Sequence, residues 1–344
     1  MTWRIDCFIR IKLLGSDEPN LAISICMQRR LFLGNILKPI GLITTACVGA
    51  TPPAPGSAAA PGQPDAPKTE ALTKIKSGGF NALAVAQASF HRMFKDGSLT
   101  LDTFPHWVKM QCGLTRVQWS GGLLPAITQA SAKTLRGACD AQGVRSLLID
   151  PSIGIGLASA DAGVSGAALE RLKPWCDIAI ELACTGLAID LRGEGTYEEQ
   201  LPRAVAGANL AFKVAAAVGL PLVAQSLGGF TSNATFMAAL MEQLKNAAIR
   251  LEPTFDSWKI SEQETYNRAR GMGLMLPYAA SILADYTDFA TDGDSVNFKS
   301  DYLMRQIRAT TFRGPVAILY KGPGDELAGV LKAKSILIKY KCVV

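Results

Sequence analysis

From residue 80 onward, short apolar runs alternate with longer segments of helical periodicity, and this alternation limits the fold more than any other feature. Eight such runs occur, each about the length of a β-strand. They cover residues 82–86, 115–119, 144–149, 186–191, 220–224, 249–255, 282–287 and 315–320. Strands that alternate with helices build parallel sheets, because the chain must cross back over the sheet before each new strand.

The segments between the runs have the periodicity of helices that pack on one side of a sheet. Residues 197–218 and 233–247, for example, place small and apolar side chains at i, i+3, i+4 and i+7, with polar ones opposite. Eight strand–helix units predict a closed (β/α)8 TIM barrel rather than an open doubly wound sheet. No Gly-x-Gly-x-x-Gly follows the first run, which also disfavours a dinucleotide-binding fold.

The first 76 residues differ in composition and are expected to precede the folded domain. Residues 51–66 are rich in proline, alanine and glycine, which predicts a linker over 51–76. Upstream, Arg29 and Arg30 precede an apolar stretch that ends in small residues, which is typical of a twin-arginine export signal over 27–50. The alternative is that the two arginines begin an ordinary amphipathic helix.

The export hypothesis leaves the start of the chain open between Met1 and Met27. If Met27 is the start, residues 1–26 are an upstream extension, and the folded domain occupies 77–344. A variant of the hypothesis makes Cys47 a lipidated cysteine, although the residues before it are an imperfect lipoprotein box. Export predicts a periplasmic protein, and a signal that does not function would leave it cytoplasmic. Membrane association is expected only through export or through a lipid on Cys47.

Charge and metal-ligand composition exclude two classes of function. The chain carries 35 Lys and Arg against 29 Asp and Glu, and residues 77–344 hold only +2 of the net +6. Without a cationic run, this domain is not expected to bind nucleic acid. Eight cysteines without a CxxC spacing and two histidines argue against a Cys/His zinc site, so the cysteines are expected to be buried thiols.

Chemistry in a (β/α)8 barrel lies at the carboxyl ends of the strands, and polar residues follow the predicted strands here. The first, second and third runs are followed or ended by Gln87, Ser89, His91, Arg92, Gln118, Trp119, Ser120 and Asp150. The later runs supply Asp190, Arg192, Gln225, Ser226, Thr254, Asp256, Trp258, Asp285, Tyr286, Asp288, Tyr320 and Lys321. We expect these side chains to surround one mouth of the barrel.

Several local motifs resemble the sugar phosphate isomerase/epimerase family, the xylose isomerase-like barrels, over essentially all of 80–340. Ser89-Phe90-His91-Arg92, with Phe104-Pro105 downstream, is similar to the opening of that family. Further similar motifs are Arg192-Gly193, Gly228-Gly229-Phe230-Thr231-Ser232-Asn233, Leu276-Pro277-Tyr278-Ala279 and the segment 286–289. The resemblance implies a divalent metal held by carboxylates and histidine, and proton transfer along a sugar through an enediol.

The acids that this chemistry needs are largely replaced. Ala224 or Gln225 and Thr254 stand where the family has Glu and Asp, and Leu319 and Lys321 replace two glutamates near the end. Gln118 replaces a further acid, and Lys321 would repel a cation. A standard metal site is therefore not expected. A rearranged site for Mn, Mg or Zn would need Asp190, Asp256, Asp285 and Asp288 to converge, and the alternative is that each caps a loop or helix.

Candidate roles follow from these positions. His91, Asp256 and Asp285 are the candidate catalytic residues, His91 because it could orient or deprotonate a hydroxyl group. Candidate substrate-binding residues are Arg92, Trp119, Asp190, Arg192, Gln225, Trp258 and Tyr320, with the aromatic rings as platforms for a sugar. The alternatives are that His91 and Arg92 belong to a polar cluster that closes the barrel, and that the aromatic side chains only cover its core.

Two hypotheses of function therefore stand side by side. The first is an isomerase- or epimerase-like protein that acts on or binds a small carbohydrate or polyol, with degraded or rearranged metal-dependent catalysis. The second is a non-catalytic barrel, a pseudoenzyme, that binds a carbohydrate or a partner surface. The sequence does not name the substrate or the oligomeric state.

Overall fold

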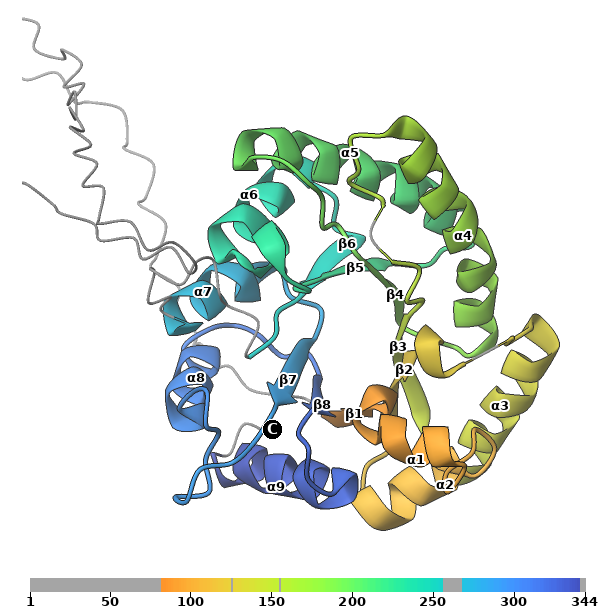
Figure 1. Cartoon of the computed structure of the whole chain (residues 1–344), viewed down its shortest axis with the longest axis vertical. Helices are drawn as coiled ribbons and strands as arrows, with labels where there is room; N and C mark the ends of the chain where they lie inside the picture. Colours follow the sequence, from red (N-terminus) through yellow and green to blue (C-terminus); the bar gives the residue numbers. More distant parts are fainter. Residues whose placement is uncertain (1–81, 125, 155, 256–267, 341–344) are drawn as a thin grey trace, which may run out of the picture. The chain divides into compact units, whose positions relative to one another are not determined.

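The structure, a computed structural model, describes residues 82–124, 126–154, 156–255 and 268–340, all within one compact unit of the chain, Thr69–Val344. Eight parallel strands form one sheet in the order β6-β5-β4-β3-β2-β1-β8-β7. They are β1 (Leu83–Ala86), β2 (Arg116–Ser120), β3 (Arg145–Asp150), β4 (Gly186–Ile189), β5 (Leu222–Gln225), β6 (Ile249–Glu252), β7 (Ile282–Tyr286) and β8 (Val316–Tyr320). Figure 1 shows the strands at the centre of a ring of helices.

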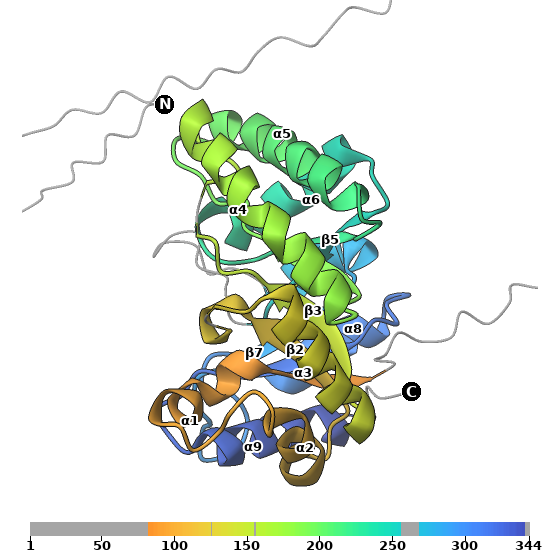
Figure 2. The same ribbon diagram turned by 90° about the vertical axis from the view of Figure 1, so that its right-hand side faces the viewer.

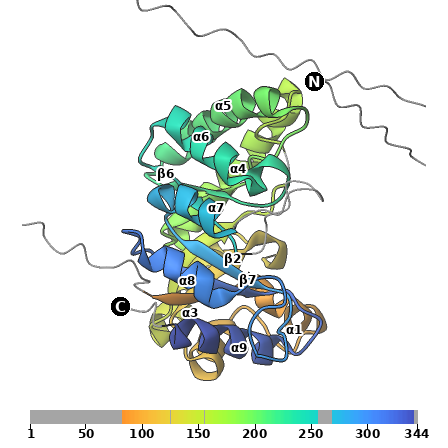
Figure 3. The ribbon, with the colours of Figure 1, turned by 90° about the vertical axis from the view of Figure 1, so that its left-hand side faces the viewer.

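The helices return the chain between strands and cover the outside of the sheet. They are α1 (His91–Asp96), α2 (Phe104–Trp107), α3 (Gln129–Gln142), α4 (Ala162–Glu181), α5 (Tyr197–Ala216), α6 (Ala234–Leu244), α7 (Arg268–Met275), α8 (Ser300–Arg308) and α9 (Glu326–Lys339). Each helix from α3 to α9 contacts the next along the ring, with α3, α4 and α5 on one side (Figure 2) and α7, α8 and α9 on the other (Figure 3). This is the predicted (β/α)8 TIM barrel.

The sheet closes between β6 and β7, where the two strands meet through isolated bridges instead of a continuous ladder. Leu251 pairs with Ala279 and Thr254 pairs with Leu283. The backbone N–H of Leu283 donates to the Pro253 carbonyl at 2.9 Å. Pro253 has no N–H to offer a ladder, which explains why β6 ends at Glu252 and not at Phe255 as the apolar pattern predicts.

Side chains alternate between two separate hydrophobic clusters along the strands. The larger cluster joins strands to helices and includes Ile282 and Ala284 of β7. The smaller cluster contains only strand residues, among them Ala84, Val223, Leu283 and Ala317, so it fills the inside of the barrel. The inner residues at the carboxyl ends of the strands therefore face one common space, which we call the barrel mouth.

The sequence-based expectations for the fold are confirmed where the structure describes the chain. All eight predicted strands are present, with ends shifted by a few residues. Cys112, Cys139, Cys176 and Cys184 are buried free thiols, as expected, and burial raises the pKa of Cys112 and Cys139 to about 12. The extension, export signal and linker lie outside the described residues. Among those described, no helix is both long and apolar enough to cross a membrane.

Candidate active site at the barrel mouth

The polar centre of the barrel is Glu252, a residue that the sequence analysis missed. Its side chain is fully buried, and Oε2 accepts hydrogen bonds from Gln225 Nε2 at 2.7 Å and from Gln118 Nε2 at 3.0 Å. Oε1 accepts from Ser281 Oγ at 2.7 Å. Because its neighbour Leu251 belongs to the outer cluster, Glu252 faces inward. The charged residue inside an apolar run was the signal that could have found it.

Burial controls the protonation of this centre. Desolvation raises the pKa of Glu252 above its ordinary value, although the hydrogen bonds from Gln225, Ser281 and Gln118 oppose the shift and the charge of Asp150 adds to it. The pKa of Asp150 is also raised, mainly by burial. Its carboxylate accepts hydrogen bonds from Ser152 N and Oγ, at 2.9 and 3.3 Å. Two carboxyl groups with raised pKa values therefore belong to neighbouring parts of the mouth.

A cation and a carboxylate pair where the mouth meets β7 and β8. Lys321 Nζ lies 2.7 Å from Asp285 Oδ2, and Asp285 Oδ1 accepts from the Phe255 N–H at 2.8 Å. Asp285 is 1% exposed, whereas 42% of the Lys321 side chain is accessible. The ammonium group thus neutralises the carboxylate and remains available to a ligand.

Asp190 and Arg192, both predicted to bind substrate, bind each other. Arg192 Nε lies 3.0 Å from both carboxylate oxygens, and Nη2 lies 2.6 Å from Oδ2. The Arg192 backbone N–H also donates to Asp190 Oδ1 at 2.9 Å. Asp190 therefore makes an Asx-type turn after β4 and orients Arg192, whose guanidinium is about one-third exposed.

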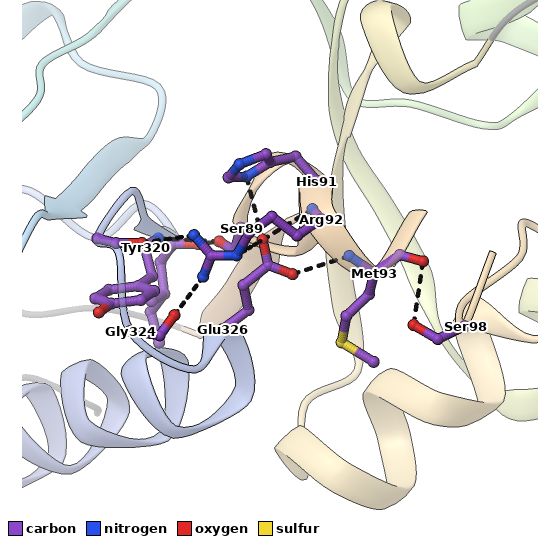
Figure 4. A network of polar contacts seen from close by, with 10 residues as sticks. Ser89, His91, Arg92, Met93, Ser98, Tyr320, Gly324 and Glu326 are labelled. Carbon is purple, nitrogen blue, oxygen red and sulfur yellow. Dashed lines mark hydrogen bonds and ion pairs between the residues drawn. The ribbon is translucent and has the colours of Figure 1, made fainter. Parts of the chain in front are cut away.

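His91 and Arg92 form the polar cluster that was the alternative to a catalytic role (Figure 4). Glu326, at the start of α9, is almost fully buried and accepts from the backbone N–H groups of Arg92 and Met93 at 2.9 and 3.2 Å. His91 Nδ1 lies 3.2 Å from the same carboxylate. The Arg92 guanidinium donates to the carbonyls of Gly322 and Gly324. These contacts join the first and last units of the barrel and occupy most of the donors of Arg92.

Two of the three predicted aromatic platforms face the wrong side of the sheet. Trp119 is 1% exposed, and its indole N–H donates to Ser146 Oγ at 2.9 Å. Tyr320 is 4% exposed and stacks on Phe289, with ring centroids 6.0 Å apart. Because their neighbours Gln118 and Lys321 point inward, these rings point outward into the helical layer and do not reach a ligand in the mouth. The third platform, Trp258, lies outside the described residues.

The predicted rearranged metal site is not assembled in the part of the chain that the structure describes. There, no three His, Cys, Asp or Glu side chains come together as metal ligands. Asp190 and Asp285 are held by Arg192 and Lys321, and exposed Asp288 accepts from the N–H of Phe289 at 2.8 Å. Asp256 lies outside the described residues. Gln225 is brought into the centre, as a donor to Glu252.

Three buried polar atoms, on residues at or near the carboxyl ends of β1, β2 and β5, have no hydrogen-bond partner among the described residues. They are Gln87 Nε2, Gln118 Oε1 and Ser226 Oγ. Gln87 follows β1 and Ser226 follows β5, and all three side chains are at most 5% exposed. Buried polar groups are nearly always paired, so these atoms call for a water molecule or a ligand. Their chemistry is that of neutral donors and acceptors.

The sequence matches the family described as xylose isomerase-like TIM barrel over residues 110–337. The chain belongs to this family. Its fold is similar to that of D-psicose 3-epimerase with D-tagatose from Clostridium cellulolyticum H10, at 12% identity and a TM-score of 0.57, over 76% of this chain and 96% of that one. It is also similar to 3-keto-D-glucoside 4-epimerase from E. coli, at 11% identity and a TM-score of 0.59, over 75% and 99%.

A third solved structure, L-ribulose 3-epimerase, has 14% identity and a TM-score of 0.58, over 76% of this chain and 94% of that one. Likeness at this level of identity shows the fold alone. No curated protein resembles the sequence closely enough to count as a match.

The described mouth does not fit the carboxylate-bound metal that the family resemblance implies. Gln118 and Gln225, at or beside positions where the family resemblance implies acids, both donate N–H groups to Glu252. An amide that donates to a carboxylate aims a positive dipole at the space where a cation would need negative ligands. Lys321, at a third replaced acid, brings a full positive charge to Asp285. We therefore derive no chemical step through a metal.

We expect Glu326→Ala to weaken the junction between the first and last units of the barrel. The substitution leaves the N–H groups of Arg92 and Met93 without their acceptor and removes the partner of two basic side chains. The free energy of unfolding in urea should fall by about 2–4 kcal/mol. Glu198→Ala, at an exposed position of α5, should change it by less than about 0.5 kcal/mol. Equal effects would contradict the assigned role of Glu326.

We expect Glu252→Gln to change how stability depends on pH. In the wild type, the folded state holds the Glu252 proton more tightly than the unfolded chain does. The free energy of unfolding therefore falls as the pH rises above the ordinary pKa of this group, 4.5. The variant has no carboxyl group at position 252, so this fall in the free energy of unfolding is absent from it. Its stability relative to wild type, from urea unfolding, should rise between pH 4 and pH 7. Glu198→Gln should give a flat difference, and a flat difference for Glu252→Gln would refute the raised pKa.

Proposed function

We propose that this barrel binds a small neutral carbohydrate or polyol at its mouth. The observation that carries the proposal is a set of buried atoms that have no hydrogen-bond partner in the described part of the chain: Gln87 Nε2, Gln118 Oε1 and Ser226 Oγ. A hydroxyl group can donate and accept at once, so a polyhydroxylated ligand can satisfy one amide N–H, one amide carbonyl and one serine hydroxyl together. The sugar epimerases with similar folds support the same class of ligand.

Charge at the mouth agrees with a neutral ligand. The carboxylates of Asp190 and Asp285 are paired with Arg192 and Lys321, and burial raises the pKa of the two other carboxyl groups, Asp150 and Glu252, which favours their neutral form. Both cations keep part of their surface accessible and can donate to hydroxyl oxygens. In this proposal the metal-centred proton transfer of the family is absent or rearranged, and the protein acts as a binding barrel. Export to the periplasm remains part of the proposal.

Lys321→Met tests the binding site. The ligands to compare are D-fructose, D-tagatose and sorbitol. For whichever of them binds most tightly, we expect the substitution to weaken binding by about tenfold, because a charge-assisted hydrogen bond is lost. Isothermal titration calorimetry measures the affinity. The matched control is Lys173→Met, which breaks a similar ion pair, with Glu170 at 2.6 Å, on the outer surface of α4. Binding of none of the three ligands, or equal loss in both variants, would overturn the proposal.

A second candidate function is retained proton transfer without a metal. The raised pKa values of Asp150 and Glu252 favour it, because carboxyl groups tuned toward neutral pH suit general acid–base work. Asp150 is only partly buried and is the better placed of the two to meet a ligand. It would take the proton from a carbon next to a sugar carbonyl.

This candidate predicts exchange of a carbon-bound proton with solvent. With D-fructose or D-tagatose in D2O and excess EDTA, the protein should incorporate deuterium next to the carbonyl, seen by proton NMR. Asp150→Asn should reduce the rate by at least about a hundredfold. The matched control, Asp140→Asn on the exposed face of α3, should leave it unchanged. Binding without deuterium incorporation would leave the binding barrel as the function and exclude this candidate.

A further inference from the structure

The amino ends of the strands enclose a cavity of about 760 Å³, at the end of the barrel opposite the mouth. Its wall includes residues at or just before the start of every strand from β2 to β8, among them Arg116, Thr185, Pro221 and Pro315. We call it the base cavity. Its volume lies within the usual range for sites that hold small organic molecules. The carbohydrate site proposed above lies at the other end of the barrel.

The wall of the base cavity is positively charged, mainly because of arginine side chains. Arg116, Arg136, Arg145 and Arg250 line it, against one acid, Asp140. Asp140 is the partner of Arg136, at 3.5 Å on the same helix. The cavity wall therefore carries an excess of three positive charges, in a domain whose net charge is small.

Two of these arginines are neighbours on adjacent strands. Arg116 and Arg145 are direct partners in the register of β2 and β3, so their side chains leave the sheet about 5 Å apart. In the described part of the chain, neither guanidinium has an ion pair or hydrogen bond that would offset the repulsion. Like charges directly opposite each other destabilise a sheet. An anion bound between them would convert this repulsion into attraction.

The third arginine is held in place by the backbone. Arg250 Nε donates to the Tyr278 carbonyl at 2.9 Å, and Nη2 donates to the Ala279 carbonyl at 3.0 Å. These bonds use one edge of the guanidinium, and Nη1 has no hydrogen bond or ion pair with the described residues. A side chain fixed in this way loses little further freedom when it binds a ligand.

Part of the inner wall of the cavity is apolar. Leu147, Leu148 and Val223 line it and belong to the cluster that fills the inside of the barrel. The cavity therefore combines cationic side chains at the strand ends with a deeper apolar surface. An inorganic anion would use the first feature only, whereas an organic anion with an apolar body would use both.

We propose that the base cavity binds an organic phosphate: a dianionic phosphate group at Arg116, Arg145 and Arg250, with an apolar or ring-shaped body against the inner wall. Guanidinium groups match the oxygens of a phosphate in bidentate geometry, and the excess of positive charge favours a dianion over a monocarboxylate. This site is independent of the proposed carbohydrate site at the mouth.

Phenyl phosphate is the probe, because it is a dianion with an apolar ring and is not a carbohydrate. Calorimetric titration into the full chain should show binding, weakened by added salt. The double variant Arg116→Gln/Arg145→Gln should weaken it by at least about tenfold. The control Arg171→Gln/Lys213→Gln removes the same charge from exposed positions of α4 and α5 and should change it by less than about twofold. Inorganic phosphate, phenol and benzoate should each bind more weakly than phenyl phosphate.

Three results would overturn the proposal. They are no binding of phenyl phosphate to the full chain, equal binding by the Arg116→Gln/Arg145→Gln variant, and inorganic phosphate binding as tightly as phenyl phosphate. Without ligand, that variant should melt at or above the temperature of the wild type, because a repulsion is removed, and this shows that it folds. Lys321→Met should leave phenyl phosphate binding unchanged, so failure at the mouth and failure at the base are distinguishable.

Discussion

A fully buried carboxyl group at the centre of a barrel determines what the neighbouring strands can carry. Glu252 has no solvent to stabilise it, so its oxygens need donors from the protein. Gln118 and Gln225 supply two N–H groups and Ser281 supplies a hydroxyl, each from a different strand or loop. Acids at either glutamine would bring like charges together in a low-dielectric space and would require a shared proton or a cation between them. The amides of Gln118 and Gln225 and the carboxyl group of Glu252 therefore depend on one another.

This dependence gives a physical reason for amides at Gln118 and Gln225, where the family resemblance leads one to expect acids. A metal centre is held by several carboxylates that repel one another until the cation binds. Here the charges are balanced within the protein instead. Glu252 is surrounded by amides, and Lys321 neutralises Asp285. With each negative group already matched, the mouth presents hydroxyls, amides and half-exposed cations to a ligand, which are the groups that recognise a polyol.

The fold could be predicted from the sequence because the signal is local and repeated eight times. It was harder to predict which side chains of a strand face the inside of the barrel, because an error of one residue moves every side chain to the opposite face. Trp119 and Tyr320 were assigned to the mouth from their place near strand ends, yet Gln118 and Lys321 beside them are the inward residues. Contacts between residues far apart in the sequence could not be predicted. Nothing local in the sequence indicates that Glu326 accepts from Arg92 and Met93, or that Gln118 donates to Glu252.

The two ends of the barrel differ in a way that follows from how charges are compensated. At the mouth, Asp190 and Asp285 lie next to opposite charges, Glu252 is held by neutral donors, and the buried atoms without a partner among the described residues are neutral. At the base, Arg116 and Arg145 are placed side by side by the register of two central strands. A sheet does not gain stability from that pair, so the two arginines together favour a counter-charge between them. The two proposals thus place recognition of hydroxyl groups at one end of the barrel and recognition of an anion at the other. Ser281, which lines the base cavity and donates to Glu252, links the two ends by a single hydrogen bond.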